Sequence, residues 1–331
     1  MITRLAELLD RFPTRTVTVV GDIMADEFIY GRIARVSREA PVLILEYDST
    51  QIVAGGAGNA ANNVASLGGR VRLIGATGRD EAGRRAIASL HRRVERDGLL
   101  RSRDLRTPTK TRILAGGIHS AKQQVVRIDR DVGRPLERAA GEQFARSVDA
   151  AVASCDAVIL SDYGSGLVTP ALAGRIKAAI AGGPPTPILV DSRYGLLGYR
   201  GLTTCTPNES EVEQLLGVTI DDDSKVLERA GRSLLTRTRM TSVLITRGSR
   251  GMALFEPRRP TVHLPIHGSD QIADVTGAGD TVIAAMSMAL ACGASAAEAA
   301  QLANVAGGLV VMKRGTATVT LGELRAAVEA G

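Results

Sequence analysis

The sequence predicts an α/β protein built on a doubly wound, mostly parallel sheet, and three observations support this prediction. Short apolar runs rich in valine and isoleucine recur along the chain, each followed closely by glycine or aspartate. Segments with a helical spacing of apolar residues lie between those runs. Such alternation of strands and helices favours parallel strands covered by helices on both faces. With 331 residues, 44% of them hydrophobic, residues 1–331 are expected to form one domain around a large core.

The strands are predicted where β-branched residues cluster over a few consecutive positions. These runs are too short for helices, and the glycine and aspartate residues that follow them are typical of strand ends. In chain order the predicted strands are Thr16–Val20, Val71–Ile74, Ala157–Leu160, Ile188–Val190 and Ser242–Ile245.

The helices are predicted in the longer segments between the strands, where small and apolar residues recur with helical spacing. Each of these segments is long enough to cover one face of the sheet. In chain order the predicted helices are Asn59–Leu67, Asp80–Arg96, Glu137–Ala153, Pro170–Ala181, Asp223–Thr238, Ala278–Ala291 and Ala296–Met312.

Two stretches, Phe28–Val53 and Thr107–Asp129, break this alternation. Both have an extended, partly alternating pattern without an intervening helix, so we expect them to form a small separate β-sheet. A sheet inserted at these points would lie over the carboxyl ends of the parallel strands, where α/β sheets bind ligands, and would act as a lid. Its exposed edges could pair with a second copy, which predicts a homodimer through the lid.

Composition argues against several classes of protein. The longest apolar runs, such as Ala284–Ala291, are much shorter than the roughly 20 residues that a membrane span needs. Charged residues interrupt the first 15 residues, so a secretory signal is not expected and a cytoplasmic protein is. The three cysteines contain no C-x-x-C pair, which suits a reducing compartment. The 41 basic and 35 acidic residues are interleaved and aromatic residues make up only 3%, so no nucleic-acid partner is expected.

The strongest chemical signal is Asp274-Val-Thr-Gly-Ala-Gly-Asp280, which leads into a helix of small residues. Gly277, Ala278 and Gly279 allow backbone N–H groups to converge at a helix N-terminus, a suitable site for a phosphoryl group in transfer. Asp280, in the first turn, could accept the proton of an alcohol that attacks the γ-phosphorus of a nucleotide. The alternative is an ordinary helix start, with Asp280 interacting only with the helix dipole.

A second glycine-rich element, Ala54-Gly-Gly-Ala-Gly-Asn59, precedes another helix of small residues. The spacing from Gly56 to Ala61 would fit a dinucleotide-binding fingerprint, but the element follows an extended region rather than the first strand. A Walker phosphate loop is absent, because the sequence contains no Gly-Lys dipeptide. Phosphate binding must therefore depend on another device.

Together these motifs resemble the PfkB, or ribokinase-like, carbohydrate kinase family over essentially the whole chain. The resemblance rests on Asp274–Asp280, Gly55–Asn59, Asn208-Glu-Ser-Glu211 and Thr246-Arg-Gly-Ser-Arg-Gly251, which correspond in order to four motifs of that family. It implies a ribokinase-like fold with ATP and Mg²⁺ as cofactors. It leaves open whether a monovalent cation is also bound.

The resemblance also implies roles for individual residues. Asp280 would be the base, and Gly277, Ala278 and Gly279 would form the anion hole. Asn208 and Glu211 would organise hydrated magnesium, an ion that prefers oxygen ligands and retains water. The implied nucleotide contacts are Asn208, Arg193, Thr246, Gly248 and Gly251.

Further stretches resemble the branch of the family that phosphorylates D-glycero-D-manno-heptose 7-phosphate at its anomeric hydroxyl for ADP-heptose synthesis. The implied product is the 1,7-bisphosphate. Alternatives are another sugar or nucleoside kinase of the family, or a non-catalytic sensor of sugar phosphates. The stretches that carry this resemblance are Gly21–Asp26, Arg35–Val42, Thr109–Arg112, Gln123–Asp129, Ser161–Tyr163 and Gly315–Thr320.

The acceptor contacts follow from the chemistry of a sugar phosphate. Carboxylates and amides hold hydroxyl groups, which favours Asp22, Asp26 and Asn59, with Gly55 and Gly56 in the same loop region. The distal phosphate needs fixed positive charge. Four cations of the predicted lid could supply it, although each could equally belong to a solvated strand face; these are Arg35, Lys110, Arg112 and Arg127.

Two positions depart from the pattern of the related kinases. Ser165 stands where they carry a lysine, and Arg193 stands where they have the lysine of Asp-Pro-Lys. Arg193 keeps a planar, charged group that can hold phosphate, whereas Ser165 removes a charge from the site.

Overall fold

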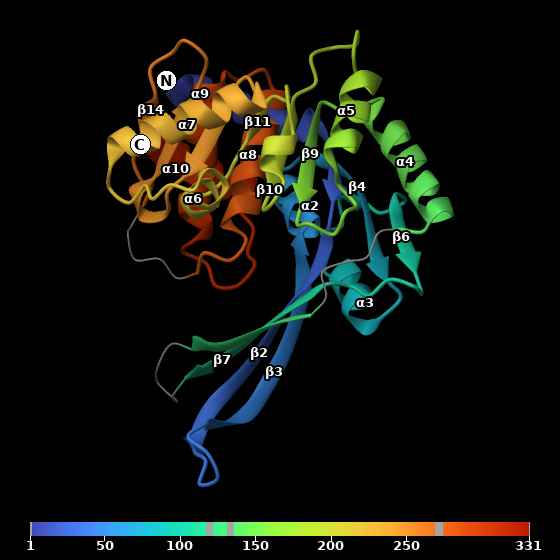
Figure 1. The fold of residues 1–331 in the computed structure, drawn as a ribbon, viewed down its shortest axis with the longest axis vertical. Coiled ribbons are helices and arrows are strands. Elements are labelled where there is room, and N and C mark those ends of the chain that lie inside the picture. Colours follow the sequence, from blue (N-terminus) through green and yellow to red (C-terminus); the bar gives the residue numbers. More distant parts are fainter. Residues whose placement is uncertain (1, 117–121, 131–135, 269–273, 331) are drawn as a thin grey trace.

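The computed structural model describes residues 2–116, 122–130, 136–268 and 274–330, and its body is a seven-stranded sheet (Figure 1). The strand order is β11-β10-β9-β1-β4-β5, and β6 also pairs with β4. Every pairing in this sheet is parallel, so the predicted fold class is confirmed. The strands are β1 (Thr16–Gly21), β4 (Arg70–Gly78), β5 (Val94–Glu95), β6 (Leu99–Ser102), β9 (Ala157–Asp162), β10 (Ile188–Ser192) and β11 (Thr204–Cys205).

Helices cover both faces of this sheet and divide the core in two. One apolar cluster lies beneath α1, α2, α8, α9 and α10, and a second lies beneath α4, α5, α6 and α7. All six residues of β9 are buried, as expected for a central strand covered on both faces. The helices are α1 (Ile2–Arg11), α2 (Ala57–Ser66), α3 (Glu81–Ala88), α4 (Arg138–Val152), α5 (Pro170–Ala179), α6 (Glu209–Leu216), α7 (Ser224–Thr238), α8 (Ala278–Ala291), α9 (Ala296–Val310) and α10 (Leu321–Ala330).

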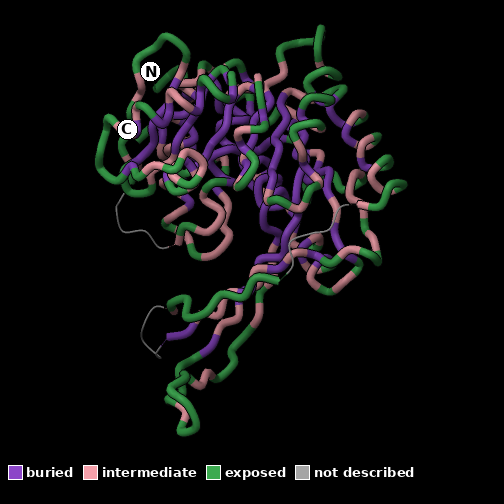
Figure 2. The backbone as a smooth tube through the Cα atoms, in the orientation of Figure 1, coloured by how far each residue is buried: buried purple, intermediate pink, exposed green. Residues whose placement is uncertain are grey.

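A second sheet, the lid sheet, has the order β3-β2-β7-β8 and projects from the body (Figure 1). The β2–β7 pairing is parallel, and the outer two pairings are antiparallel. Most of its outer part is exposed, in contrast to the buried centre of the body (Figure 2). Residues 117–121 of the predicted lid stretch lie outside the described residues. The strands are β2 (Ile23–Val36), β3 (Leu43–Gly56), β7 (Thr109–Gly116) and β8 (Gln123–Arg130).

Two predicted elements need correction. The helix predicted over Asp80–Arg96 is wrong beyond Ala88, because Val94 pairs with Val71 and forms the short edge strand β5 instead. The strand predicted over Ser242–Ile245 exists as β12 (Val243–Thr246), but it pairs antiparallel in a separate three-stranded sheet with β13 (Met252–Phe255) and β14 (Val262–Leu264).

No helix in the described part of the chain combines the length and apolar character that crossing a membrane requires.

Candidate functional site

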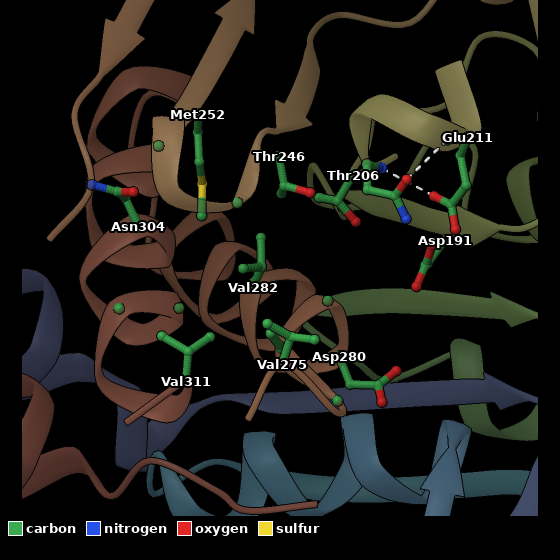
Figure 3. A pocket seen from close by; sticks show the side chains of 18 of the residues that line it. Asp191, Thr206, Glu211, Thr246, Met252, Val275, Asp280, Val282, Asn304 and Val311 are labelled. Carbon is green, nitrogen blue, oxygen red and sulfur yellow. Dashed lines mark hydrogen bonds between the residues drawn. The ribbon is translucent and has the colours of Figure 1, made fainter. Parts of the chain in front are cut away.

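A large pocket of about 360 Å³ lies at the N-terminus of α8, between α6, α9 and the loop that follows β12 (Figure 3). Its apolar wall includes Val275, Val282 and Val311, and its polar part includes Asp191 and Asp280. An apolar wall with a few convergent polar groups is typical of a small-molecule site. The pocket brings together a large part of the predicted site, namely Arg193, Asn208, Glu211, Thr246, Gly248, Gly251, Gly277, Ala278, Gly279 and Asp280.

A small pocket of about 120 Å³ lies beside it, between the lid sheet and the body. Asp22 and Ser165 line it from the body, and Lys110 and Arg127 line it from the lid sheet. Tyr163 and Arg193 line both pockets, so the two cavities adjoin at these side chains.

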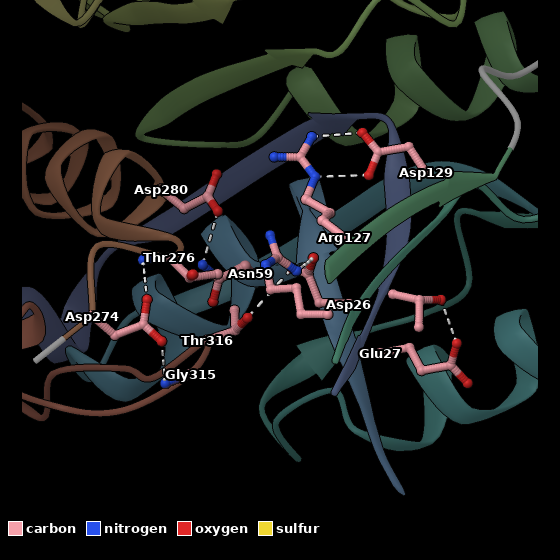
Figure 4. A network of polar contacts seen from close by, with 12 residues as sticks. Asp26, Glu27, Asn59, Arg127, Asp129, Asp274, Thr276, Asp280, Gly315 and Thr316 are labelled. Atoms are coloured by element: carbon pink, nitrogen blue, oxygen red, sulfur yellow. Dashed lines mark hydrogen bonds and ion pairs between the residues drawn. The ribbon is translucent and has the colours of Figure 1, made fainter. Parts of the chain in front are cut away.

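Asp280 lies in the first turn of α8 and is 4% exposed. The amide Nδ2 of Asn59 donates to its Oδ2 at 2.8 Å (Figure 4). The hydroxyl of Tyr163 donates to its Oδ1 at 3.3 Å. Burial raises the pKa of Asp280 to about 7, against the opposing effect of these hydrogen bonds. A carboxyl with that pKa is well suited to act as a general base near neutral pH.

The glycine-rich turn before Asp280 is fixed from both sides. Asp274 accepts hydrogen bonds from the backbone N–H groups of Thr276, at 2.9 Å, and Gly315, at 3.0 Å (Figure 4). Gly277 has a φ of 76°, and a Cβ there would lie 2.4 Å from Nδ2 of Asn59. Glycine is therefore required at 277 for both reasons. The first turn of α8, whose N–H groups lack intrahelical acceptors, forms the wall of the large pocket beside Asp280.

Asp22 is buried between β1 and β2. It accepts hydrogen bonds from the backbone N–H groups of Tyr163, at 2.7 Å, and Ser165, at 3.3 Å, and from the Ser165 hydroxyl. Burial raises the pKa of Asp22, while these hydrogen bonds oppose the shift. Ser165 therefore holds Asp22 through both its backbone N–H and its hydroxyl. A Cβ on Gly56 would lie 2.5 Å from the Asp22 carbonyl oxygen.

The Asp26 carboxylate has partners on the lid sheet and on the segment before α10. Arg112 forms an ion pair with it at 2.6 Å, with both side chains largely buried, and the Thr316 hydroxyl donates to it at 3.3 Å. A Cβ on Gly55 would lie 2.3 Å from the Asp26 carboxylate, so glycine there permits the approach. The charge of Arg112 is thus already neutralised, and the same holds for Arg127, which donates two hydrogen bonds to Asp129 at 2.7 and 2.5 Å.

Lys110 and Arg193 differ from these two arginines, because neither forms an ion pair with any of the described carboxylates. Each instead lies over the ring of Tyr163, with Lys110 Nζ and Arg193 Cζ both 4.9 Å from its centroid. Burial, together with the neighbouring positive charge of Arg193, lowers the pKa of Lys110 to about 8. Arg35, by contrast, is exposed opposite Ile44 towards the far end of β2 and lines neither pocket.

Asn208 and Glu211 form a capping box at the start of α6. The Asn208 side chain accepts from the Glu211 N–H at 2.9 Å, and the Glu211 carboxylate accepts from the Asn208 N–H at 3.0 Å. Burial, together with the nearby Glu211 and Asp280 carboxylates, raises the pKa of Asp191 to about 8. Carboxylates that converge in this way suit Mg²⁺. Because no three described His, Cys, Asp or Glu side chains are arranged to bind a metal together, water would complete its coordination.

Glu209, the first residue of α6, points to the loop after β12. Its Oε2 accepts from Arg247 Nε at 3.1 Å, and its Oε1 accepts from Arg250 Nη2 at 2.8 Å. The Glu209 and Arg247 side chains are only 10% and 13% exposed. This loop carries Gly248 and Gly251 of the large pocket, so Glu209 connects it to the helix that carries Asn208 and Glu211.

Sequence reasoning missed Tyr163, Asp191 and Glu209 as functional candidates. Asp191 directly follows a predicted strand and Tyr163 lies three residues after another, and this position near strand ends was the available signal. Glu209 had no comparable signal, because its arginine partners lie 38 and 41 residues away in the sequence.

Comparison with known proteins identifies relatives over nearly the whole chain. The chain is 41% identical to the bifunctional protein HldE of Caulobacter vibrioides over 330 residues, which are 97% of this chain and 65% of that protein. It is 39% identical to HldE of Trichlorobacter lovleyi, over 97% of this chain and 64% of that protein. The chain therefore spans just under two thirds of the length of these relatives.

Solved structures share the fold at lower identity. Ribokinase of Arabidopsis thaliana in complex with ribose and ATP superimposes with a TM-score of 0.69 at 21% identity, covering 96% of this chain and 98% of that one. Phosphofructokinase-2 of Escherichia coli in complex with fructose-6-phosphate gives a TM-score of 0.73 at 16% identity, with the same coverage. The predicted ribokinase-like fold is therefore confirmed. The family model for pfkB carbohydrate kinases matches residues 14–321, and this chain belongs to that family of ATP-dependent carbohydrate kinases.

Proposed function

We propose that this kinase transfers the γ-phosphoryl group of ATP to the anomeric hydroxyl of D-glycero-D-manno-heptose 7-phosphate, giving the 1,7-bisphosphate used in ADP-heptose synthesis. The observation that carries the proposal is the small cationic pocket that adjoins the pocket of Asp280 at Tyr163. An acceptor with a reactive hydroxyl at one end and a phosphate at the other fits this arrangement. The stretches that resemble the heptose kinase branch of the family support the choice of this sugar.

In this proposal the large pocket binds ATP, with the base against Val282 and Val311 and the phosphates near the N-terminus of α8. Asp280 accepts the proton of the acceptor hydroxyl as the hydroxyl oxygen attacks the γ-phosphorus and ADP leaves. Backbone N–H groups from Gly277 onwards stabilise the charge on the transferred group. A hydrated Mg²⁺ held near Asp191, Asn208 and Glu211 would supply further neutralisation of the phosphates.

The acceptor lies between Asp280 and the lid sheet in this scheme. Asp22, Asp26 and Asn59 bind its hydroxyl groups, and Lys110 with Arg193 binds its distal phosphate. A tyrosine ring orders these two cations without acting as a counter-ion. Arg127 is close enough to line the same pocket, but its pairing with Asp129 makes it the weaker contributor.

A homodimer through the lid sheet completes the proposal, with the rest of the chain as one kinase domain. Exposed large apolar side chains are concentrated on the lid sheet and the turn that joins β2 and β3, a pattern typical of an interface. These residues are Ile33, Val36, Val42, Leu43, Tyr47, Val125, Val126 and Ile128.

The acceptor assignment is tested by comparing the phosphorylated and unphosphorylated heptose in Lys110→Ala. Loss of a hydrogen bond to a charged group predicts a KM for heptose 7-phosphate about 10- to 150-fold higher. The unphosphorylated heptose should be a poor acceptor for the wild type and change little in the variant, because it never makes the deleted contact.

Lys122→Ala is the matched control. Lys122 also belongs to the lid region and lies 5.4 Å from the ring centroid of a tyrosine, Tyr30, but it lines neither pocket. Its removal should leave both KM values unchanged. Equal losses for the two sugars in Lys110→Ala would contradict a phosphorylated acceptor and indicate a kinase for neutral sugars.

A further inference from the structure

Tyr163 makes four separate contacts at the boundary of the two pockets. Its hydroxyl donates to Asp280, its backbone N–H donates to Asp22, and its ring lies beneath Lys110 and Arg193. It is thus in contact with the proposed base, a proposed hydroxyl contact and both proposed phosphate-binding cations. None of the motif roles inferred from the sequence involves this side chain.

We propose that Tyr163 is a positioning residue that sets the distance between the acceptor's phosphate and the catalytic base. This inference rests on the proposed function. The ring fixes one end of the acceptor site through Lys110 and Arg193, while the hydroxyl fixes the other through Asp280. A single rigid side chain with two rotatable bonds therefore determines how far apart phosphate and reacting hydroxyl are held.

The Tyr163 ring is suited to this role because it orders two cations without neutralising their charge. Arg112 and Arg127 are held by the carboxylates of Asp26 and Asp129, which cancel their charge. An aromatic face attracts a cation through its quadrupole and leaves the cation's net charge intact. Lys110 and Arg193 are consequently ordered and still available to a dianionic phosphate.

The hydroxyl acts at the other end of the side chain. Burial raises the pKa of the Tyr163 phenol well above its usual value, so the group stays protonated at neutral pH and donates to the Asp280 carboxylate. That hydrogen bond favours the carboxylate form of Asp280, as does the one from Asn59. The charged groups around Asp280 are Asp26 and Asp191, which oppose ionisation, and Arg193, which favours it.

Two substitutions test the roles of the Tyr163 hydroxyl and the Tyr163 ring separately. Tyr163→Phe keeps the ring and removes the hydroxyl, so the KM for heptose 7-phosphate should stay within about twofold of wild type. The acid limb of its kcat/KM profile should move up by about half a pH unit, because the Asp280 carboxylate loses a donor. Tyr163→Leu removes the ring as well, and its KM for heptose 7-phosphate should rise about tenfold more than its KM for the unphosphorylated heptose.

Tyr199→Phe is the matched control, because the Tyr199 hydroxyl also donates to a buried aspartate, Asp162, at 2.8 Å but lines neither pocket. It should lower thermal stability without moving the acid limb or the ratio of the two KM values. ADP titration confirms that each variant is folded. An unmoved acid limb in Tyr163→Phe overturns the hydroxyl role, and equal KM losses for both sugars in Tyr163→Leu overturn the ring role. A wild type that does not distinguish the two sugars contradicts the proposed function instead, while the acid limb still tests the hydroxyl with any accepted sugar.

Discussion

Asp280 shows how opposing local effects set the chemistry of a single carboxyl. Burial alone would keep it protonated and unable to accept a proton, whereas the donors Asn59 and Tyr163 draw its pKa back to about 7. The donors come from α2 and from the end of β9, elements that are far apart in the sequence. The environment of the proposed base is therefore produced by the meeting of three segments and not by the glycine-rich motif alone.

Asp280→Asn should reduce turnover by about 10²- to 10⁴-fold, the usual range for loss of a general base. Affinity for ADP should remain nearly unchanged, because the amide has the same shape and the nucleotide contacts are elsewhere. Steady-state rates with a coupled ADP assay, together with calorimetric titration of ADP, measure both quantities. Turnover near that of the wild type would exclude Asp280 as the base.

The same carboxyl predicts the pH dependence of the wild type. Only the deprotonated form of Asp280 can accept a proton, so kcat/KM should fall as the pH drops through about 7. Lys110, with its pKa lowered to about 8, loses its charge as the pH rises, so the KM for a phosphorylated acceptor should increase above that value. The optimum for such an acceptor therefore lies between about 7 and 8.

At the scale of elements, Glu209 connects α6 with the loop after β12. Each of its carboxylate oxygens accepts from one arginine of that loop, and Arg250 also contacts Asp222 at 2.6 Å. Thr246 reinforces the connection through a bridge to Asn208. The proposed magnesium-binding helix and the proposed nucleotide loop thus form one unit behind the large pocket.

Glu209→Gln should weaken ADP binding by about 5- to 30-fold, since it removes the nearly buried carboxylate charge that pairs with Arg247 and Arg250. The KM for the acceptor should change less than twofold. Glu228→Gln is the control, because Glu228 pairs with Arg232 on α7, away from both pockets. If the two variants bind ADP equally well, the connection has no part in nucleotide binding. Arg250→Gln, at a position that is 40% exposed, offers the same test with less risk to folding.

Local sequence patterns predicted an element correctly where the residues of that segment alone determine its structure. The helix over Ala278–Ala291 has the predicted bounds, because small residues after a glycine-rich turn define both its start and its face. Asp80–Arg96 was wrong in its second half, where the pairing of Val94 with Val71 overrides local preference. The glycine-rich turn and Asp280 were predictable for the same local reason.

Pairings between distant segments could not be predicted. The ion pair of Arg112 with Asp26 spans 86 residues, and it changes the expected role of Arg112 from a phosphate ligand to a partner of a carboxylate. The ring beneath Lys110 belongs to Tyr163, which follows β9 and lies 53 residues after Lys110 in the sequence. Spacing along the chain gives no information about such contacts.

At the scale of the whole molecule, the exposed apolar side chains of the lid sheet allow the proposed dimer to be tested. Val126→Glu should convert the proposed dimer to a monomer, because a charge would be buried against the second copy. Met312→Glu is the control, since Met312 on the body is 45% exposed, against 48% for Val126. Sedimentation velocity measures the mass of each variant. A wild type that is monomeric at micromolar concentration would contradict the dimer.

The position of Asp22 gives the lid sheet a mechanical property. Asp22 is the single residue between β1, which belongs to the body, and β2, which with β3 is one of the two longest strands of the lid sheet. With 14 residues, β2 extends about 45 Å, so a rotation of about 5° at Asp22 would displace its far end by about 4 Å. Asp22 is therefore both a proposed contact of the acceptor and the residue about which β2 would rotate relative to the body. A small shift of Asp22 around a bound sugar would move the far end of β2 by a distance several times larger. In the proposed dimer, that end contacts the second copy of the chain.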